Sequence, residues 1–278
     1  MKKIRFILLL AIVVLLLLII WIAWGNTALQ LNSYTITSDR LPKAFDGFRI
    51  AQVSDLHNAE MGKHNEKLIS MLADAAPNII VITGDLIDAN NTNVDTALAF
   101  AKEAVQIAPC YYVTGNHEAA VSEYKTLKNG LTELGVIVLE DDKTEIVLSG
   151  ESITLIGVDD PGFQTDDPTA AMDGTLDELI GEDDGYRILL SHRPELFKTY
   201  VAHSVDLVFS GHAHGGQFRL PFVGGLFAPG QGLFPEYEAG IYTEENTNML
   251  VSRGVGNSII PFRVNNRPEV ILVELAVE

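Results

Sequence analysis

Five apolar segments of the chain end in side chains of the kinds that bind metal ions. They read Gln52-Val-Ser-Asp55-Leu-His57, Val81-Ile-Thr-Gly-Asp85, Tyr112-Val-Thr-Gly-Asn116-His117, Leu189-Leu-Ser-His192 and Val208-Phe-Ser-Gly-His212-Ala-His214. We expect each segment to be a strand, and the carboxyl ends of parallel strands converge on the ligand crevice of an α/β sheet. If the strands share a sheet, these polar groups meet in one place. Their oxygen and imidazole donors suit hard or borderline divalent ions.

The spacing of these residues supports the same prediction. In the Asp-x-His and His-x-His pairs, residues two apart along an extended backbone point the same way and can bind one ion. Gly84, Gly115 and Gly211 allow a tight turn just before a ligand and leave room at a crowded site. A single histidine is more often an ordinary polar residue, as we expect for His64 and His203. Five of the seven histidines, however, follow strand ends: His57, His117, His192, His212 and His214.

The order of these motifs resembles the signature of calcineurin-like metallophosphoesterases. It reads Asp-x-His, Gly-Asp, Gly-Asn-His-Glu, a later His and Gly-His-x-His, and it extends from Asp55 to His214. The run Gly211-His-Ala-His-Gly-Gly-Gln217, the later Pro229-Gly-Gln-Gly and an apolar N-terminus are similar to the YkuE/YaeI-like branch. The resemblance implies an α/β fold: a four-layer αββα sandwich of two mixed β-sheets flanked by helices, with an N-terminal transmembrane helix.

The resemblance also implies a role for each matching residue. Two divalent ions would be bound, one by Asp55, His57 and His214, the other by Asn116, His192 and His212, with Asp85 bridging them. His117 would not be a ligand but would stabilise or protonate the leaving group, oriented by Asp55.

Two ions about 3.5–4 Å apart give a bridging hydroxide at neutral pH, which attacks phosphorus in line. General acid help from His117 adds roughly 10²–10⁴ in rate. We therefore expect a binuclear phosphohydrolase, a phosphodiesterase or pyrophosphatase, acting on a small or lipid-linked phosphoester. Mn, Zn, Fe and Mg all suit the ligands. One alternative is a catalytically silent metal-binding scaffold with the same fold, and another is an extracytoplasmic metal-storage protein, which leaves His117 without a role.

The N-terminus predicts a membrane anchor. The segment from Phe6 to Trp24 has no polar residue and is long enough to span a bilayer, whereas a secretory signal has a shorter apolar region of roughly 7–15 residues. Lys2, Lys3 and Arg5 precede it, which places the N-terminus in the cytoplasm and the domain outside. We expect an anchor over 1–24, a juxtamembrane linker over 25–45 that becomes an edge strand, and a metallophosphoesterase domain over 46–278.

Composition excludes other classes of protein. The net charge of −18 is poorly suited to duplex nucleic acid or to an anionic membrane surface, because both depend on clustered Lys and Arg. The 47% hydrophobic content is too high for a disordered chain. Cys110 is the only cysteine, so no internal disulfide can form, and we expect it to be a small buried hydrophobe.

The order of the predicted strands and helices indicates one domain with two sheets. Strands are expected at 49–54, 78–83 and 110–114, with helices at 64–75, 94–107 and 118–134. These are followed by a hairpin near 146–158 and a helix near 173–180. Strands at 187–190 and 206–209 then lie on either side of a short helix. The last expected strands are at 249–252 and 270–275.

Several features leave two interpretations open. The apolar stretch from Phe218 to Pro235 could be a lipid-facing wall, but we favour a loop folded onto the second sheet. Arg193 and Arg253 could contact phosphate, although structural ion pairs are the favoured interpretation. Asp159 and Asp160 could support the site or lie in a solvated turn. Glu118 is explained by a helix start.

Overall fold

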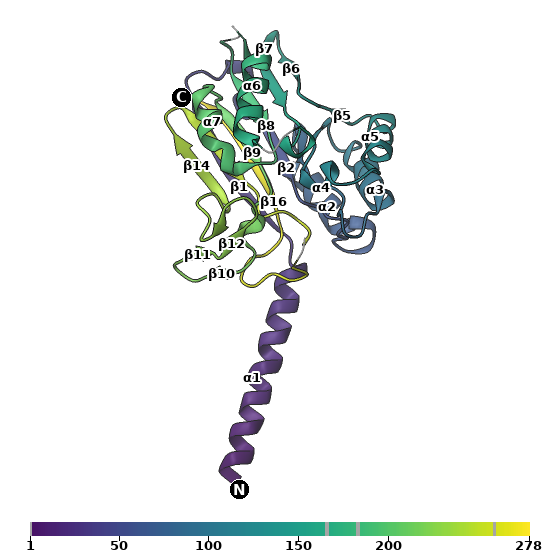
Figure 1. Ribbon diagram of the computed structural model, residues 1–278, viewed down its shortest axis with the longest axis vertical. Helices are drawn as coiled ribbons and strands as arrows, with labels where there is room; N and C mark the ends of the chain where they lie inside the picture. Colours follow the sequence, from purple (N-terminus) through teal and green to yellow (C-terminus); the bar gives the residue numbers. More distant parts are fainter. Residues whose placement is uncertain (1, 165–166, 182–183, 258–259) are drawn as a thin grey trace.

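Two six-stranded sheets stack face to face, and helices cover their outer faces (Figure 1). This computed structural model describes residues 2–164, 167–181, 184–257 and 260–278. The strand order is β1-β16-β2-β3-β4-β5 in the first sheet and β14-β15-β9-β8-β7-β6 in the second. Both sheets are mixed, since parallel strands run beside antiparallel neighbours. The expected four-layer αββα architecture is therefore confirmed.

The bounds of the elements follow the predicted segments closely. The first sheet contains β1 (Gln30–Ser38), β2 (Arg49–Val53), β3 (Ile79–Thr83), β4 (Cys110–Val113), β5 (Ile137–Val138) and β16 (Glu269–Val277). The second contains β6 (Asp142–Leu148), β7 (Glu151–Gly157), β8 (Arg187–Leu190), β9 (Leu207–Ser210), β14 (Gly240–Glu244) and β15 (Thr247–Val251). Two small hairpins pair β10 (Arg219–Leu220) with β11 (Gly224–Gly225) and β12 (Phe227–Ala228) with β13 (Gly232–Leu233).

All the helices except α1 divide between the two outer layers. They are α1 (Lys2–Thr27), α2 (Glu66–Ala75), α3 (Val94–Ala104), α4 (Asn116–Ala119), α5 (Tyr124–Glu133), α6 (Pro168–Ile180) and α7 (Phe197–Ala202). Short 3₁₀ turns are η1 (Lys43–Phe45), η2 (Lys63–Asn65), η3 (Pro161–Phe163), η4 (Pro194–Leu196) and η5 (His214–Gly216). The helix expected over 118–134 is thus two helices, and the first of them begins at Asn116.

Alternation along the strands builds the layers. In β3, Ile79 and Val81 join the core between the two sheets, while Ile80 and Ile82 pack under the helices. Successive side chains of a strand point to opposite faces, so a strand that is covered on both sides reads as a continuous apolar run. The same two-sided burial holds β4 and β8 in place. Their carboxyl ends are thereby fixed by the core rather than by surface loops.

Helix α1 projects away from the domain (Figure 1). Its most apolar 18-residue stretch has a mean hydropathy of 3.5 with no part buried, so it is long and apolar enough to cross a membrane. The segment 25–45 contains the end of α1 and then β1, which pairs in parallel with β16 at the edge of the first sheet. Asn26 fixes this junction, because its side chain donates to the carbonyl of Arg263 (2.9 Å) and accepts the Arg263 N–H (2.7 Å).

Candidate metal centre

The ligand-type residues come together where strands of both sheets end. Strands β2, β3 and β4 of the first sheet lead to Asp55, Asp85 and Asn116, and strands β8 and β9 of the second lead to His192 and to the His212–His214 segment. The strands do not share one sheet. The carboxyl edges of two stacked sheets meet instead, so the site lies across the junction between them.

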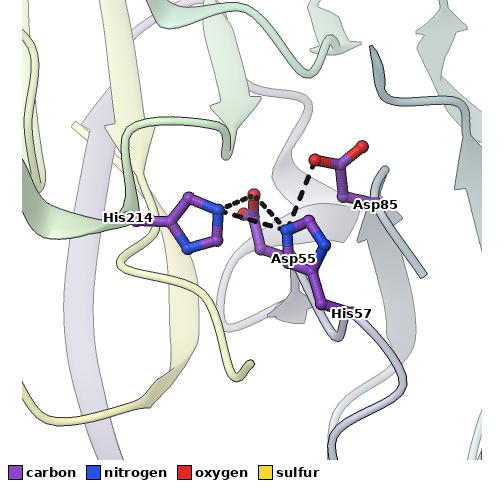
Figure 2. Close-up of side chains that lie close together, drawn as sticks. All are labelled: Asp55, His57, Asp85 and His214. Carbon is purple, nitrogen blue, oxygen red and sulfur yellow. Dashed lines mark hydrogen bonds and ion pairs between the residues drawn. The ribbon is translucent and has the colours of Figure 1, made fainter. Parts of the chain in front are cut away.

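One group of donors consists of Asp55, His57, Asp85 and His214, drawn in Figure 2, whose ligand atoms lie within 4.8 Å of one another. The Nε2 atoms of His57 and His214 are 3.1 Å apart. His214 Nε2 is also 3.4 Å from Asp55 Oδ1, and His57 Nε2 is 3.4 Å from Asp85 Oδ2. All four residues are buried, so their donor atoms face one another and not solvent.

A second group contains Asp85, His192 and His212. His192 Nε2 lies 3.2 Å from Asp85 Oδ2 and 3.2 Å from His212 Nδ1. Asn116 Oδ1 lies 3.2 Å from the same His192 nitrogen, so the asparagine joins this group. Asp85 Oδ2 therefore faces histidines of both groups.

Three of the four histidines in the two groups are held in the neutral form that binds a cation. Burial holds the pKa of His57 down to about 4 and the pKa values of His212 and His214 well below the usual range, so these rings keep free lone pairs. Burial also opposes a charge on His192, but the Asp85 carboxylate outweighs it and raises the His192 pKa to about 10. Burial would likewise raise the pKa of Asp85, yet His192 holds it well below its usual value. A bound cation would take the place of the His192 proton beside Asp85, and buried carboxylates and imidazoles in mutual contact are a fitting donor set for divalent ions.

The backbone is strained at most of these donors. Five of them have a positive φ, between 45° and 65°: Asp55, His57, Asp85, His212 and His214. Non-glycine residues rarely adopt this conformation, and strained residues cluster at functional sites. Our geometric reason for the Asp-x-His and His-x-His spacing was therefore wrong, because these residues are not extended. His212 and His214 instead fall in different groups.

Glycines make room for the donors, as the sequence predicts. A Cβ on Gly115 would lie 2.2 Å from Asp85 Oδ1, and a Cβ on Gly211 would lie 2.4 Å from Asp55 Oδ2. Gly84 has a φ of +83°, and a Cβ there would lie 2.7 Å from His192 Nδ1. Any larger residue would displace a donor.

Comparison with known proteins identifies the family. Residues 48–216 match the family described as calcineurin-like phosphoesterase. The chain belongs to this family. It is 31% identical to the metallophosphoesterase YkuE of Bacillus subtilis, a match that covers 89% of this chain and 85% of YkuE. It is 29% identical to the phosphodiesterase YaeI of Escherichia coli, over 82% of each chain.

Two further matches are more distant or partial. The zebrafish (Danio rerio) transmembrane protein with metallophosphoesterase domain is 28% identical over 86% of this chain and 56% of that protein. Among solved structures, TT1561 of Thermus thermophilus superposes with a TM-score of 0.52 at 14% identity, covering 75% of this chain and 90% of that one. The latter supports the fold alone. As a member of this family, the chain is a metal-dependent phosphoesterase, and its buried Asp/His cluster suits the divalent ions that such an enzyme requires.

His117 of this phosphoesterase lies beside the donors. Its ring packs edge-on against His57 with centroids 4.5 Å apart, and its backbone N–H donates to Asp85 Oδ1 (2.9 Å). The Ala89 backbone N–H donates to His117 Nδ1 (2.8 Å). In the neutral ring that bond leaves the proton on Nε2. The resemblance implies that Asp55 orients this ring; Nδ1 contacts the Ala89 amide and, at 4.0 Å, the carboxylate of Asp88.

Three supporting side chains were not predicted as part of the site. Asp88 Oδ2 lies 3.7 Å from His57 Nδ1, on the far side of that ring from the donor cluster. Arg263, almost fully buried, has Nη2 3.4 Å from His214 Nδ1. Glu118, which we explained by a helix start, is fully buried and accepts backbone N–H groups of Asp85 and Gly115. Such partners orient ligand side chains and tune the metal. Sequence patterns carry little signal for Asp88 and Arg263, because each is a single polar residue in a loop, whereas Glu118 is the last residue of the Gly-Asn-His-Glu motif and lies in α4.

Arg193 forms an ion pair rather than facing open solvent. Its Nε and Nη2 donate to the carboxylate of Asp160 (2.5 and 2.9 Å), and Nη1 lies 3.2 Å from His212 Nε2. Asp160 is buried, so the solvated turn that we considered for it is wrong. Asp159 accepts from Thr114 Oγ1 (2.8 Å). The favoured structural pairing of Arg193 is confirmed.

Proposed function

We propose that the chain is a membrane-anchored phosphohydrolase, a phosphodiesterase or pyrophosphatase, that uses two divalent ions. The observation that carries the proposal is the position of Asp85. Its Oδ2 atom lies 3.4 Å from His57 Nε2 and 3.2 Å from His192 Nε2, between the two donor groups. A single carboxylate that faces both groups is suited to be shared by two ions.

Each donor group would hold one ion. Asp55, His57 and His214 would form one site, and Asn116, His192 and His212 the other, with Asp85 common to both. Mn, Zn, Fe and Mg all accept oxygen and imidazole donors. When bound, two such ions activate a water and neutralise charge on the phosphoryl group.

His117 would act as the general acid. The Ala89 N–H occupies its Nδ1, so a neutral ring carries its proton on Nε2, where it can be given to the leaving oxygen. The ring packs edge-on against His57, which holds the imidazole at the edge of the donor cluster. A metal-storage site has no use for such a residue.

The substrate class follows from the relatives and from α1. The phosphodiesterase name of YaeI supports a phosphodiester substrate. The transmembrane name of the zebrafish relative and the apolar α1 support a membrane anchor over 1–24, a juxtamembrane segment over 25–45 and a catalytic domain over 46–278. Lys2, Lys3 and Arg5 precede the span, so a single-pass chain in the cell membrane would place the domain outside the cytoplasm. A lipid-linked phosphoester in the adjacent leaflet would then be within reach.

The function is tested by metal analysis and hydrolysis of bis-p-nitrophenyl phosphate by the full chain in detergent. We expect metal-dependent turnover that falls about 10²–10⁴-fold in His117→Asn with bound metal retained. His64→Asn is the matched control, since its side chain is 75% exposed, and it should behave as wild type. A wild-type chain that binds no metal and has no activity would overturn the enzyme proposal, and one that binds metal without turnover on any phosphoester of a broad screen would support the silent scaffold or storage protein instead.

The orientation is tested separately by reporter fusions at the C-terminus. An alkaline phosphatase fusion should be active and a fluorescent protein that folds only in the cytoplasm should be dark. The reverse pair of signals would contradict the outward placement without affecting the chemistry.

A further inference from the structure

The base of the domain, where α1 leaves it, carries an exposed apolar surface. The hairpins β10–β11 and β12–β13 lie at this end of the molecule (Figure 1). We call it the apolar base and define it by six exposed side chains: Leu220, Phe222, Val223, Phe227, Leu233 and Phe234. Exposed apolar clusters of this kind mark interaction sites.

The tips of these hairpins expose aromatic rings on strained backbone. Phe222 and Phe234 both have a positive φ, 68° and 54°, a conformation that strongly disfavours bulky residues. Phe222 is fully exposed, so packing against the described residues does not offset the free-energy cost of that strain. The strain therefore points to a contact outside the chain.

A pocket rich in arginine lies where α1 joins the domain. The cavity, of about 180 Å³, is lined by Trp21 and Trp24 of α1 and by Arg253, Arg263 and Arg267. Arg267 stacks on the Trp24 ring, with its guanidinium carbon 5.0 Å from the centroid, and donates to the carbonyls of Ala28 and Leu29.

The charge of this pocket is unusual for the chain. Arg253 faces the Glu269 carboxylate at 3.6 Å, but within the described part of the chain Arg263 and Arg267 form no ion pair. Arg267 thus carries a positive charge that forms no ion pair among the described residues of a protein of net charge −18, while Asp55 and Glu269 act electrostatically on the buried Arg263. Guanidinium groups bind phosphate well, and tryptophan favours the membrane–water interface.

The loop over 260–267 connects the pocket to the apolar base. Arg263 bonds through its backbone to Asn26 of α1, while the Arg219 N–H donates to the Val264 carbonyl (3.0 Å). The rings of Phe218 and Phe262 lie 5.4 Å apart. The two features therefore belong to one continuous face around the point where α1 would enter the bilayer.

We propose that this face docks on the bilayer that holds α1, with the apolar base inserted among the lipids and the arginine pocket binding the phosphate of an anionic phospholipid. The proposal rests on the proposed membrane anchor but not on the proposed chemistry. Part of the Phe218–Pro235 stretch does fold onto the second sheet, since Ala228 is buried in the core there, whereas the tips of the hairpins are exposed.

Docking of this face would bring the catalytic site to the membrane surface. Gly225 of the apolar hairpins packs directly on Gly216, two residues after His214, and a Cβ on Gly216 would lie only 2.3 Å from Gly225 Cα. The Asn266 side chain donates to the His214 carbonyl (2.7 Å). The same loops that would meet the lipid thus support a donor of the metal centre.

Insertion is tested with a fluorescent probe on the full chain in vesicles of phosphatidylcholine and phosphatidylglycerol. Val223→Cys and Val147→Cys form a matched pair, because these valines are 58% and 64% exposed and β6, which carries Val147, lies at the opposite end of the domain (Figure 1). Native Cys110 is buried and will not react. With a nitrobenzoxadiazole label, we expect nitroxide lipids to quench position 223 several-fold more than position 147.

Two results would overturn insertion. One is equal, weak quenching at both positions in a chain that still floats with the vesicles. The other is a blue-shifted label at position 223 without lipid quenching, which would place the face against protein, such as a second copy of the chain. A chain that fails to float would show instead that the anchor is wrong, so the two failures are distinguishable.

The pocket is tested through its own tryptophans, since Trp21 and Trp24 are the only two in the chain. Trace brominated phosphatidylglycerol should quench their fluorescence more strongly than brominated phosphatidylcholine. Arg267→Gln should abolish that preference and Arg267→Lys should retain it, with quenching by phosphatidylcholine unchanged in both. Equal quenching by the two lipids in wild type would contradict the lipid site, and loss of the preference on adding inorganic phosphate would assign the pocket to free phosphate.

Discussion

The carboxylate of Glu118 accepts the backbone N–H of Asp85, with Oε2 2.8 Å from the nitrogen. The same oxygen accepts the Gly115 N–H at 2.8 Å, and Oε1 accepts the Ile87 N–H at 3.2 Å. One fully buried side chain therefore ties the turn that carries Asp85 to the turn that carries Asn116. Those turns follow different strands, so Glu118 fixes the distance between the two donor groups.

Glu118→Gln should weaken metal binding. The glutamine NH₂ cannot accept a backbone N–H, so at least one buried amide loses its partner and the turns separate. We expect a loss of about 10–100-fold in metal affinity or activity, the usual effect of removing a partner that orients metal ligands. Titration calorimetry with Mn²⁺ measures it. Glu133→Gln on the exposed side of α5 is the control, and equal affinities in the two variants would show that Glu118 does not position the site.

Gly115→Ala should disrupt the site through a steric clash alone. The Gly115 backbone has a φ of −118°, which alanine accepts, but the added Cβ would lie 2.2 Å from Asp85 Oδ1. Overpacking of this kind costs about 1–3 kcal/mol and would move the shared carboxylate. Thermal unfolding and metal analysis should both report the loss.

Gly174→Ala provides the contrast for that clash. Gly174 lies inside α6, and a Cβ there meets no atom within 4 Å. Alanine should raise the free energy of unfolding by about 0.5–1 kcal/mol, because glycine is costly inside a helix. If both variants were equally stable, the crowding at Gly115 would not be real.

Removal of metal should lower the melting temperature. Ions that bind only the folded state stabilise it by mass action, by about 2.7 kcal/mol at a free concentration of 100 Kd. We expect a chelator to lower the Tm of the wild-type chain in detergent and Mn²⁺ to restore it. In Asp85→Asn, which lacks the shared carboxylate charge, the Tm should respond far less to either addition. A wild-type Tm that is indifferent to the chelator would argue against metal in the purified protein.

Cys110 should be inert in the folded chain. Burial raises the pKa of its thiol to about 12, so almost no thiolate exists near neutral pH, and the thiolate is the reactive form. Ellman's reagent at pH 8 should detect no thiol until denaturant is added, and one thiol afterwards. Rapid reaction without denaturant would show that β4 opens readily.

Much of this protein is determined by local sequence. Apolar runs such as Ile79–Thr83 and Cys110–Val113 predict strands, because a strand covered on both faces needs no polar residue. Polar side chains that follow directly after such a strand are therefore unusual, and they point to a functional site. The ordered motifs from Asp55 to His214 indicate the family for the same reason. The apolar run of α1 is set by composition alone.

Only the tertiary structure decided how these pieces meet. The donors come from two stacked sheets, and no local pattern records which strands pair or that Asp85 Oδ2 lies between His57 and His192. The positive φ of Asp55 and His57 depends on the turns that the packed strands impose, so the spacing argument pointed to residues that do cluster, but for the wrong geometric reason. Glu118, Arg263 and the arginine pocket act through contacts between segments far apart in the sequence. Such contacts exist only once the core has fixed where each loop lies.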